Sequence, residues 1–172
     1  MRKVEIQFTR PKSKWKFISR AIQLWEGTRY SHVRLFWHTG SGEPIIYEAS
    51  GGMVRVVGQD AARSCPVEIV HSYDFYLDKG QKHKLIGLLR YAGVSYGFTQ
   101  ILGIAVASVF KLKKNPLAMD KQQVCSELVA HFLTDVLDYK IPSRQFDLIG
   151  PKGIHKLVKA IPRRRVGLQL LD

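Results

Sequence analysis

The first half of the chain is dominated by short strand-like segments that tight turns connect. Val4, Ile6 and Phe8 alternate with charged or polar residues, a pattern typical of a strand with one buried face. Further β-rich segments lie at 31–37, 45–49, 53–57 and 67–71. Glycines occupy the turns at 40–44 and 51–52. Because consecutive strands joined by tight turns run in opposite directions, this half of the chain predicts an antiparallel sheet.

Three other segments space their apolar residues as helices do. The first ends before Gly27 and has its apolar residues at Trp15, Ile18, Ile22 and Trp25. The second begins after Leu77 and has them at Leu85, Leu88, Leu89 and Ala92. The third has its apolar stripe at Cys125, Leu128, Val129, Phe132, Leu133 and Val136. Asp120 and Gln123 match the spacing of a capping box that would start this helix just before Cys125. We expect 94–98 to be a loop, and 100–111 to be a helix or a buried loop.

The length of the chain limits it to one domain. Its 172 residues, 45% of them hydrophobic, can bury one sizeable core and leave no room for two ordinary domains. We therefore expect a single domain over 1–172. Its fold class should be α+β, with the antiparallel sheet packed against the helix that begins near Cys125.

The chain is strongly basic. Lysine and arginine number 27 against 14 acidic residues, which gives a net charge of +13. Such a charge favours anionic partners, such as a nucleic acid, an anionic membrane surface or an acidic wall polymer. The basic residues are spread over both ends and the middle, and no specific nucleic-acid motif stands out. A solvated basic face would explain the same composition without any partner.

The sequence has no feature that predicts export or membrane insertion. Met1 to Phe8 alternates like a strand and lacks the long apolar segment of a signal peptide. The longest apolar run, Ile101 to Phe110, is about half of the ~20 residues that a spanning helix needs. We therefore expect a cytoplasmic protein, unless another machine delivers it, for example as part of a phage or virion.

The residue types of a thiol hydrolase are present at three positions. A thiol in the first turn of a helix, as expected for Cys125, lies near unpaired backbone N–H groups that favour the thiolate form. A thiolate nucleophile also needs a base and a residue that orients the base, which His32 and Glu48 could supply from consecutive strands. Each has a plainer interpretation: Cys125 as a small core residue, His32 as a strand-end histidine, and Glu48 as a surface carboxylate. The residue types alone do not decide between the catalytic and the plainer interpretation of these three residues.

Other constellations in the sequence are weaker. Cys65 follows an arginine in a turn with no obvious base, so we interpret it as structural. The histidines and the two cysteines include no C-x-x-C or H-x-x-x-H pair, and we expect neither a metal site nor a disulfide framework. No cofactor is expected.

Four segments, taken in chain order, resemble a known enzyme family. They are Thr28 to Val33, Tyr47 to Ala49, Tyr96 to Phe98 and Val124 to Val129. Together they resemble the circularly permuted NlpC-like cysteine hydrolases, which are papain-fold enzymes with YiiX-type bacterial proteins and the lecithin:retinol acyltransferase group among their relatives. In the unpermuted family the cysteine helix precedes the histidine strand, whereas here the histidine comes first.

The resemblance implies a role for each site residue. Cys125 would be the nucleophile, His32 the general base and then acid, and Glu48 the residue that orients the imidazole. Tyr96 matches an aromatic position that lines the substrate site. The oxyanion would be held by the backbone N–H of Cys125 and by a second donor, for which Tyr30, Gln122 and Gln123 are candidates. Tyr30 is also a candidate substrate-binding residue.

Three functions are consistent with these features. The first is hydrolysis of an amide bond by a peptidase or amidase, for which a peptide or cell-wall peptide would be the substrate. The second keeps the same triad and acts on a lipid ester or thioester, which the apolar run at 101–110 beside basic residues would suit. The third is a non-catalytic basic binding protein, such as a virion component, on the same scaffold.

Overall fold

A seven-stranded sheet forms the centre of the computed structural model, which describes residues 2–12, 17–40, 42–58, 60, 67–119, 122–142, 146 and 148–161. The strands are β1 (Arg2–Pro11), β2 (His32–Trp37), β3 (Ile45–Ser50), β4 (Met53–Gly58), β5 (Val67–Leu77), β6 (Ser95–Tyr96) and β7 (Gln122–Gln123). They are arranged in the order β5-β1-β2-β3-β4-β6-β7. The neighbours from β5 to β6 pair antiparallel and only β6 with β7 pairs parallel, so the predicted antiparallel sheet is confirmed.

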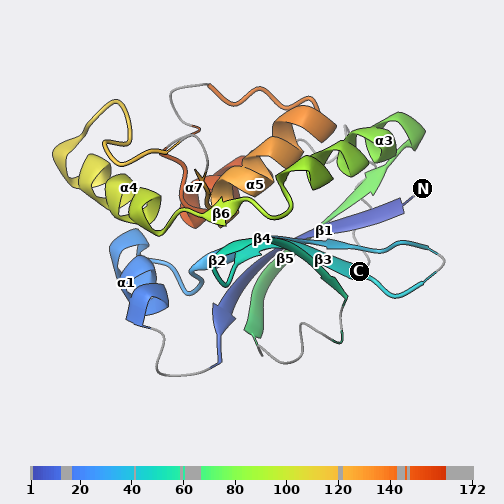
Figure 1. Ribbon diagram of the computed structural model, residues 1–172, viewed down its shortest axis with the longest axis horizontal. Coiled ribbons are helices and arrows are strands. Elements are labelled where there is room, and N and C mark those ends of the chain that lie inside the picture. The colour runs from blue at the N-terminus through green and yellow to red at the C-terminus, as the bar shows by residue number, and fades with distance from the viewer. Residues whose placement is uncertain are drawn as a thin grey trace.

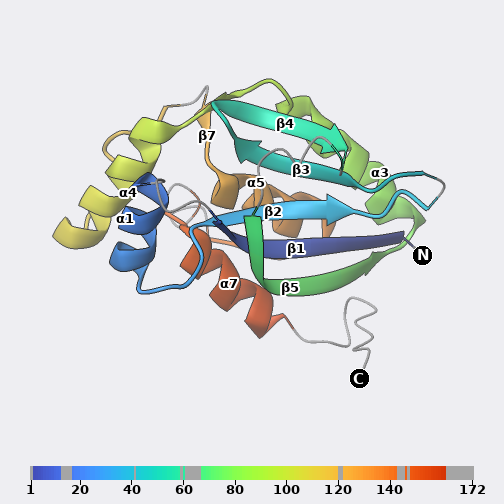
Figure 2. The same ribbon diagram turned by 90° about the horizontal axis from the view of Figure 1, so that it is seen from below.

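Helices cover one face of this sheet and one of its ends. They are α1 (Phe17–Glu26), α3 (Lys79–Gly87), α4 (Phe98–Phe110), α5 (Cys125–His131) and α7 (Pro151–Ala160), with a 3-10 turn η1 (Leu88–Tyr91) after α3 and a π-helical turn η2 (Phe132–Val136) after α5. Figure 1 shows α3, α5 and α7 along one face of the sheet and α1 with α4 at one end. Figure 2, from below, shows the strands fanning beneath α5. The α+β class is therefore confirmed.

The core forms where the alternating face of β1 meets the stripe of α5 and η2. Val4, Ile6 and Phe8 are fully buried, as are Phe132 and Leu133 on the helical side. Each large apolar side chain removed from water contributes roughly 1.5–3 kcal/mol to stability. The predicted helix is confirmed, because every position of its predicted apolar stripe is buried, although Ser126, Glu127 and Ala130 are buried as well.

Two predicted elements differ from the structure because of pairing between distant segments. The segment at 67–71 is part of an 11-residue strand, β5, which pairs with β1 rather than with the preceding β4. The predicted loop at 94–98 contains β6, because Ser95 pairs with Met53 on one side and with Gln122 on the other. Each of these pairings joins residues more than 25 positions apart.

The helix that carries Cys125 starts as predicted, but with a different cap. Gln123 belongs to β7 rather than to a capping box, and Asp120 lies outside the described residues, as do Trp15 and Cys65. Instead, the carboxylate of Glu127 accepts a hydrogen bond from the backbone N–H of Val124 at 3.0 Å. This bond ties the first turn of α5 to the end of the strand before it.

Candidate active site

The start of β2 and the start of α5 meet at one end of the sheet. His32 is the first residue of β2, opposite Thr9 of β1. Cys125 is the first residue of α5, and it follows directly after β7 and Val124. The sheet and its covering helix therefore bring a thiol and an imidazole together from positions 93 residues apart (125 − 32).

His32 is linked to a buried carboxylate on the neighbouring strand. Its Nε2 lies 3.1 Å from Oε2 of Glu48. Glu48 is only 4% exposed, so the surface-carboxylate alternative does not hold. The Nε2 to Oε2 distance lies within the ~2.6–3.2 Å range for a hydrogen bond between a base and the group that orients it.

Arg55 holds the other oxygen of Glu48. It lies directly opposite Glu48 on β4, and its Nε and one terminal nitrogen donate to Oε1 at 3.0 and 2.6 Å. Burial raises the pKa of Glu48, but hydrogen bonds and charge from His32 and Arg55 outweigh it and lower that pKa to about 2. Sequence reasoning missed Arg55, although a two-residue turn at Gly51 and Gly52 would have set it opposite Glu48.

The same imidazole also contacts the thiol. Burial lowers the pKa of His32, whereas the charge of Cys125, a hydrogen bond to its side chain and the Glu48 carboxylate raise it, with a net rise to about 10. Because Nε2 is engaged by Glu48, the Nδ1 atom is the one left for the sulfur. This arrangement lets the imidazole hold a proton next to the sulfur.

Tyr96 approaches the sulfur from another element. β6 runs parallel to β7, with Tyr96 beside Gln123, so its side chain lies close to the start of α5. Burial raises the pKa of the Tyr96 hydroxyl, and so do the charge of Cys125 and a hydrogen bond to its side chain. Tyr96 is therefore a neutral hydroxyl donor next to the thiol.

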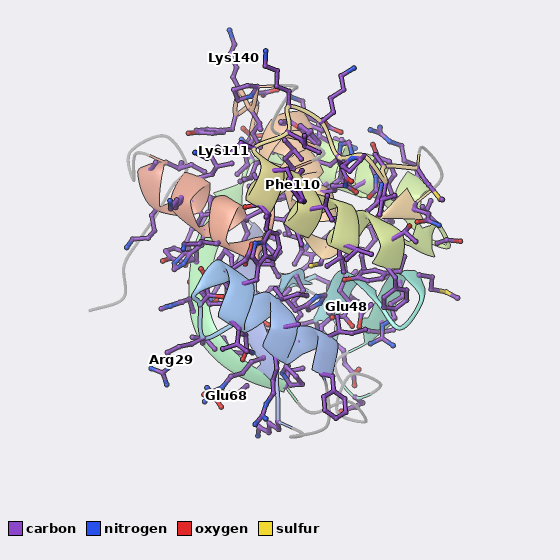
Figure 3. The ribbon with its side chains drawn as sticks, turned by 90° about the vertical axis from the view of Figure 1, so that its left-hand side faces the viewer. Arg29, Glu48, Glu68, Phe110, Lys111 and Lys140 are labelled. Carbon is purple, nitrogen blue, oxygen red and sulfur yellow. The ribbon has the colours of Figure 1, made fainter. Side chains whose placement is uncertain are left out.

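A pocket of about 510 Å³ opens beside these groups. Its polar lining includes His32, Glu48, Arg34 and Arg55, and its apolar lining includes Phe17, Ile18, Ile22, Phe98 and Ile101. Cys125 lines a narrow cavity of about 20 Å³ that shares Ile22, Ser31, Tyr96 and Ile101 with the pocket. In Figure 3, Glu48 lies between α1 and α4, the two helices that contribute the apolar wall. Tyr96 therefore borders both the pocket and the cavity that Cys125 lines.

Tyr30 lies at a different place from the one that sequence reasoning gave it. Its hydroxyl forms a hydrogen bond of 2.6 Å with Nδ1 of His155 on α7, and its ring packs against Phe8. It lines a separate hollow with His71 and His155. Tyr30 is only 4% exposed and is not among the described residues that line the pocket beside His32. Gln122 accepts a hydrogen bond from Thr99.

The site does not fit a metal ion. Across the described ranges, no three His, Cys, Asp or Glu residues group as metal ligands. Both oxygens of Glu48 are already engaged, one of them by the guanidinium of Arg55. A divalent cation would have to displace that positive charge from a buried carboxylate.

Comparison with known proteins indicates the fold. No protein-family model matches the chain, and no curated protein matches it. The chain is similar to a solved structure, metalloprotein yiiX from Escherichia coli O157:H7 (DUF1105), with a TM-score of 0.54 and 22% identity over 95% of this chain and 80% of that one. Because the match covers nearly the whole chain, the chain has a YiiX-like, papain-like α+β fold.

Proposed function

We propose that the protein is a cysteine hydrolase with a Cys125, His32 and Glu48 triad. The observation that carries this proposal is the position of His32, which contacts the thiol and, through Nε2, a buried carboxylate 3.1 Å away. A nucleophile, its base and the group that orients the base need this mutual geometry. The chain order, with His32 before Cys125, supports the permuted branch of the NlpC-like hydrolases.

The chemistry would proceed by acyl transfer to water. The thiolate attacks the carbonyl carbon, a C–S bond forms, and the carbonyl oxygen takes the negative charge. His32 donates its proton to the leaving amine as the C–N bond breaks, which leaves a thioester on Cys125. His32 then accepts a proton from water, which attacks the thioester and releases the acid and the Cys125 thiolate, so that the thiolate and the imidazolium of the first step are restored. Glu48 holds the imidazole and stabilises its charged form throughout.

The oxyanion would lie at the start of α5. The backbone N–H of Cys125 is in the first helical turn, where such groups have no partner within the helix. The hydroxyl of Tyr96, which contacts the Cys125 side chain, is the second donor that we propose. Tyr96 thus replaces Tyr30 in this role.

The test measures the thiol directly. At pH 7, iodoacetamide should label Cys125 much faster than Cys65, and an acyl probe such as a peptide p-nitroanilide should give an acyl adduct on the intact protein by mass. Cys125→Ala should lose the adduct and all turnover. Equal labelling of the two cysteines, with no adduct from any acyl probe, would contradict the triad and would favour the third function, a non-catalytic basic binding protein.

A specific observation favours lipid as a second substrate class. Large apolar side chains are exposed on α1 and α4 and in the segment after α4: Phe17, Ile18, Leu24, Phe98, Leu102, Val109, Phe110, Leu112, Leu117 and Met119. Leu24 is 83% exposed and Phe110 is 70% exposed, and Figure 3 shows Phe110 beside Lys111 at the end of α4. Lys113 and Lys114 follow. Apolar and basic groups on one surface suit an anionic lipid interface. No described helix is long and apolar enough to cross a membrane.

Vesicle binding tests this second class. If lipid is the target, the protein should sediment with anionic vesicles and stay bound at 1 M salt, where the Debye length is about 3 Å. Phe110→Ser should weaken this binding, whereas Ile86→Ser, on exposed α3 away from α4, should not. Binding that vanishes at high salt would indicate charge alone and would favour the peptide substrate.

A further inference from the structure

Arg34 is a buried cation in the wall of the pocket. It stands two residues after His32 on β2, so both side chains leave the same face of the strand. The residue is 7% exposed and lines the pocket together with Glu48. Its Nε donates to Oε1 of Gln7 at 3.0 Å. Within the described part of the chain, its two terminal nitrogens have no hydrogen-bond partner.

The pocket carries more positive than negative charge. Among its described lining residues, Arg34, Arg55 and His32, whose pKa is raised to about 10, carry positive charge, and Glu48 carries negative charge. Glu48 is already bound by Arg55 and His32, so it does not neutralise Arg34 by direct contact. A guanidinium keeps its charge even when buried. One positive charge in the wall is therefore left without a paired anion, which is costly away from water.

We propose that the pocket beside Cys125 contains a subsite for an anionic group of the substrate, and that Arg34 is the residue that binds it. The terminal nitrogens of a guanidinium match a carboxylate or a phosphate in two parallel hydrogen bonds. The lining of the same pocket also includes apolar side chains, among them Phe17, Ile22 and Ile101. The ligand class is thus an apolar acyl group that carries a carboxylate or a phosphate. The inference builds on the proposed function and names the kind of substrate.

Alkylation by a charged and a neutral reagent tests the subsite without requiring turnover. Iodoacetate and iodoacetamide have similar size and differ in charge, so the ratio of their rates at Cys125 reports the field at the sulfur. In Arg34→Gln we expect the iodoacetate rate to fall by about threefold or more relative to the iodoacetamide rate. Arg34→Lys should keep most of the ratio, because the charge remains.

A matched control separates this effect from the loss of one charge anywhere on the protein. Arg90 is exposed and pairs with Asp135, and it does not line the pocket. Arg90→Gln changes the net charge equally and should leave the ratio as in the wild type. A ratio that is the same in Arg34→Gln and Arg90→Gln would overturn the subsite, as would an equal fall in both alkylation rates with the fold intact by circular dichroism.

The wild-type protein provides a second test that no misfolded variant can obscure. Octanoate should slow the iodoacetamide reaction of Cys125 more than octanamide does, because only the carboxylate can pair with Arg34. Octyl phosphate in place of octanoate shows whether a phosphate is bound better than a carboxylate. Equal protection by the charged and the neutral compounds would overturn the proposal. If no acyl probe is turned over, the proposed hydrolase activity is wrong, whereas the preferential protection of Cys125 by octanoate would still support the anionic subsite.

Discussion

Nε2 of His32 lies 3.1 Å from one oxygen of Glu48, and Arg55 donates two hydrogen bonds to the other. The carboxylate therefore has a fixed orientation, because each oxygen has its own partner. A buried carboxylate between two such groups stays ionised, in line with its pKa of about 2. Glu48 can then stabilise an imidazolium without taking its proton.

Glu48→Gln should impair catalysis and leave the fold intact. A neutral amide cannot stabilise the charged imidazole, so we expect kcat/KM on a peptide p-nitroanilide to fall by at least about tenfold. Thermal unfolding followed by circular dichroism reports on the fold. Glu68→Gln is the matched control, since Glu68 also pairs with an arginine on a neighbouring strand and does not line the pocket. An unchanged rate in Glu48→Gln would contradict the triad.

Arg55→Met should have a smaller effect of the same kind. Glu48 keeps its bond to His32 but loses two hydrogen bonds, so its pKa should rise and kcat/KM should fall by only a few-fold, about three to ten. Arg10→Met is a close control because Arg10 also binds a glutamate on a neighbouring strand, Glu68, through its Nε and one terminal nitrogen, and the two arginine side chains are similarly exposed, at 34% and 32%. Arg55→Lys should restore part of the rate. A larger loss than in Glu48→Gln would mean that Arg55 contacts the substrate itself.

Local pattern was enough to predict the parts of the fold that short turns connect. The turns at 40–44 and 51–52 set β2, β3 and β4 side by side, which is why His32 and Glu48 could be expected on neighbouring strands. The pairing of β5 with β1 was not predictable in this way, because no turn links the two strands. The β6 pairings are equally distant in sequence, and they are what carry Tyr96 to the thiol.

Side-chain contacts also divide into those that local strand pairing predicts and those that join distant parts of the chain. Arg55 follows from register alone once the β3 and β4 hairpin is recognised. The position of Tyr30 does not follow from strand register, because its hydrogen-bond partner His155 lies on α7, 125 residues further along the chain. Tyr30 was a candidate for the substrate site and for the oxyanion, but it is buried and packs against Phe8 of the core. Tyr30 precedes β2, so the alternation of a strand does not relate its side chain to that of His32, and only the long-range contact with α7 determines where it lies.

Tyr96→Phe should separate oxyanion binding from thiol reactivity. The change removes only the hydroxyl, so kcat for amide hydrolysis should fall by roughly 10- to 100-fold. Alkylation by iodoacetamide forms no oxyanion, and its rate at Cys125 should stay within about twofold of the wild type. Tyr91→Phe, whose hydroxyl meets His131 instead, is the control and should leave both rates unchanged. Equal losses in hydrolysis and alkylation would show that Tyr96 positions the thiol instead.

The pKa shifts at the site predict how stability should depend on pH. The pKa of His32 is raised from 6.5 to about 10, so its contribution is fully present below pH 6.5 and is lost as the pH rises through 10. The pKa of Glu48 is lowered from 4.5 to about 2, so its contribution is present above pH 4.5 and is lost as the pH falls through 2. The two contributions are complete together only between about pH 4.5 and 6.5. The difference in free energy of unfolding between wild type and Glu48→Gln, measured in urea from pH 3 to 10, should be largest in that window. A difference that is constant across the range would show that the carboxylate and the imidazole do not interact as charges.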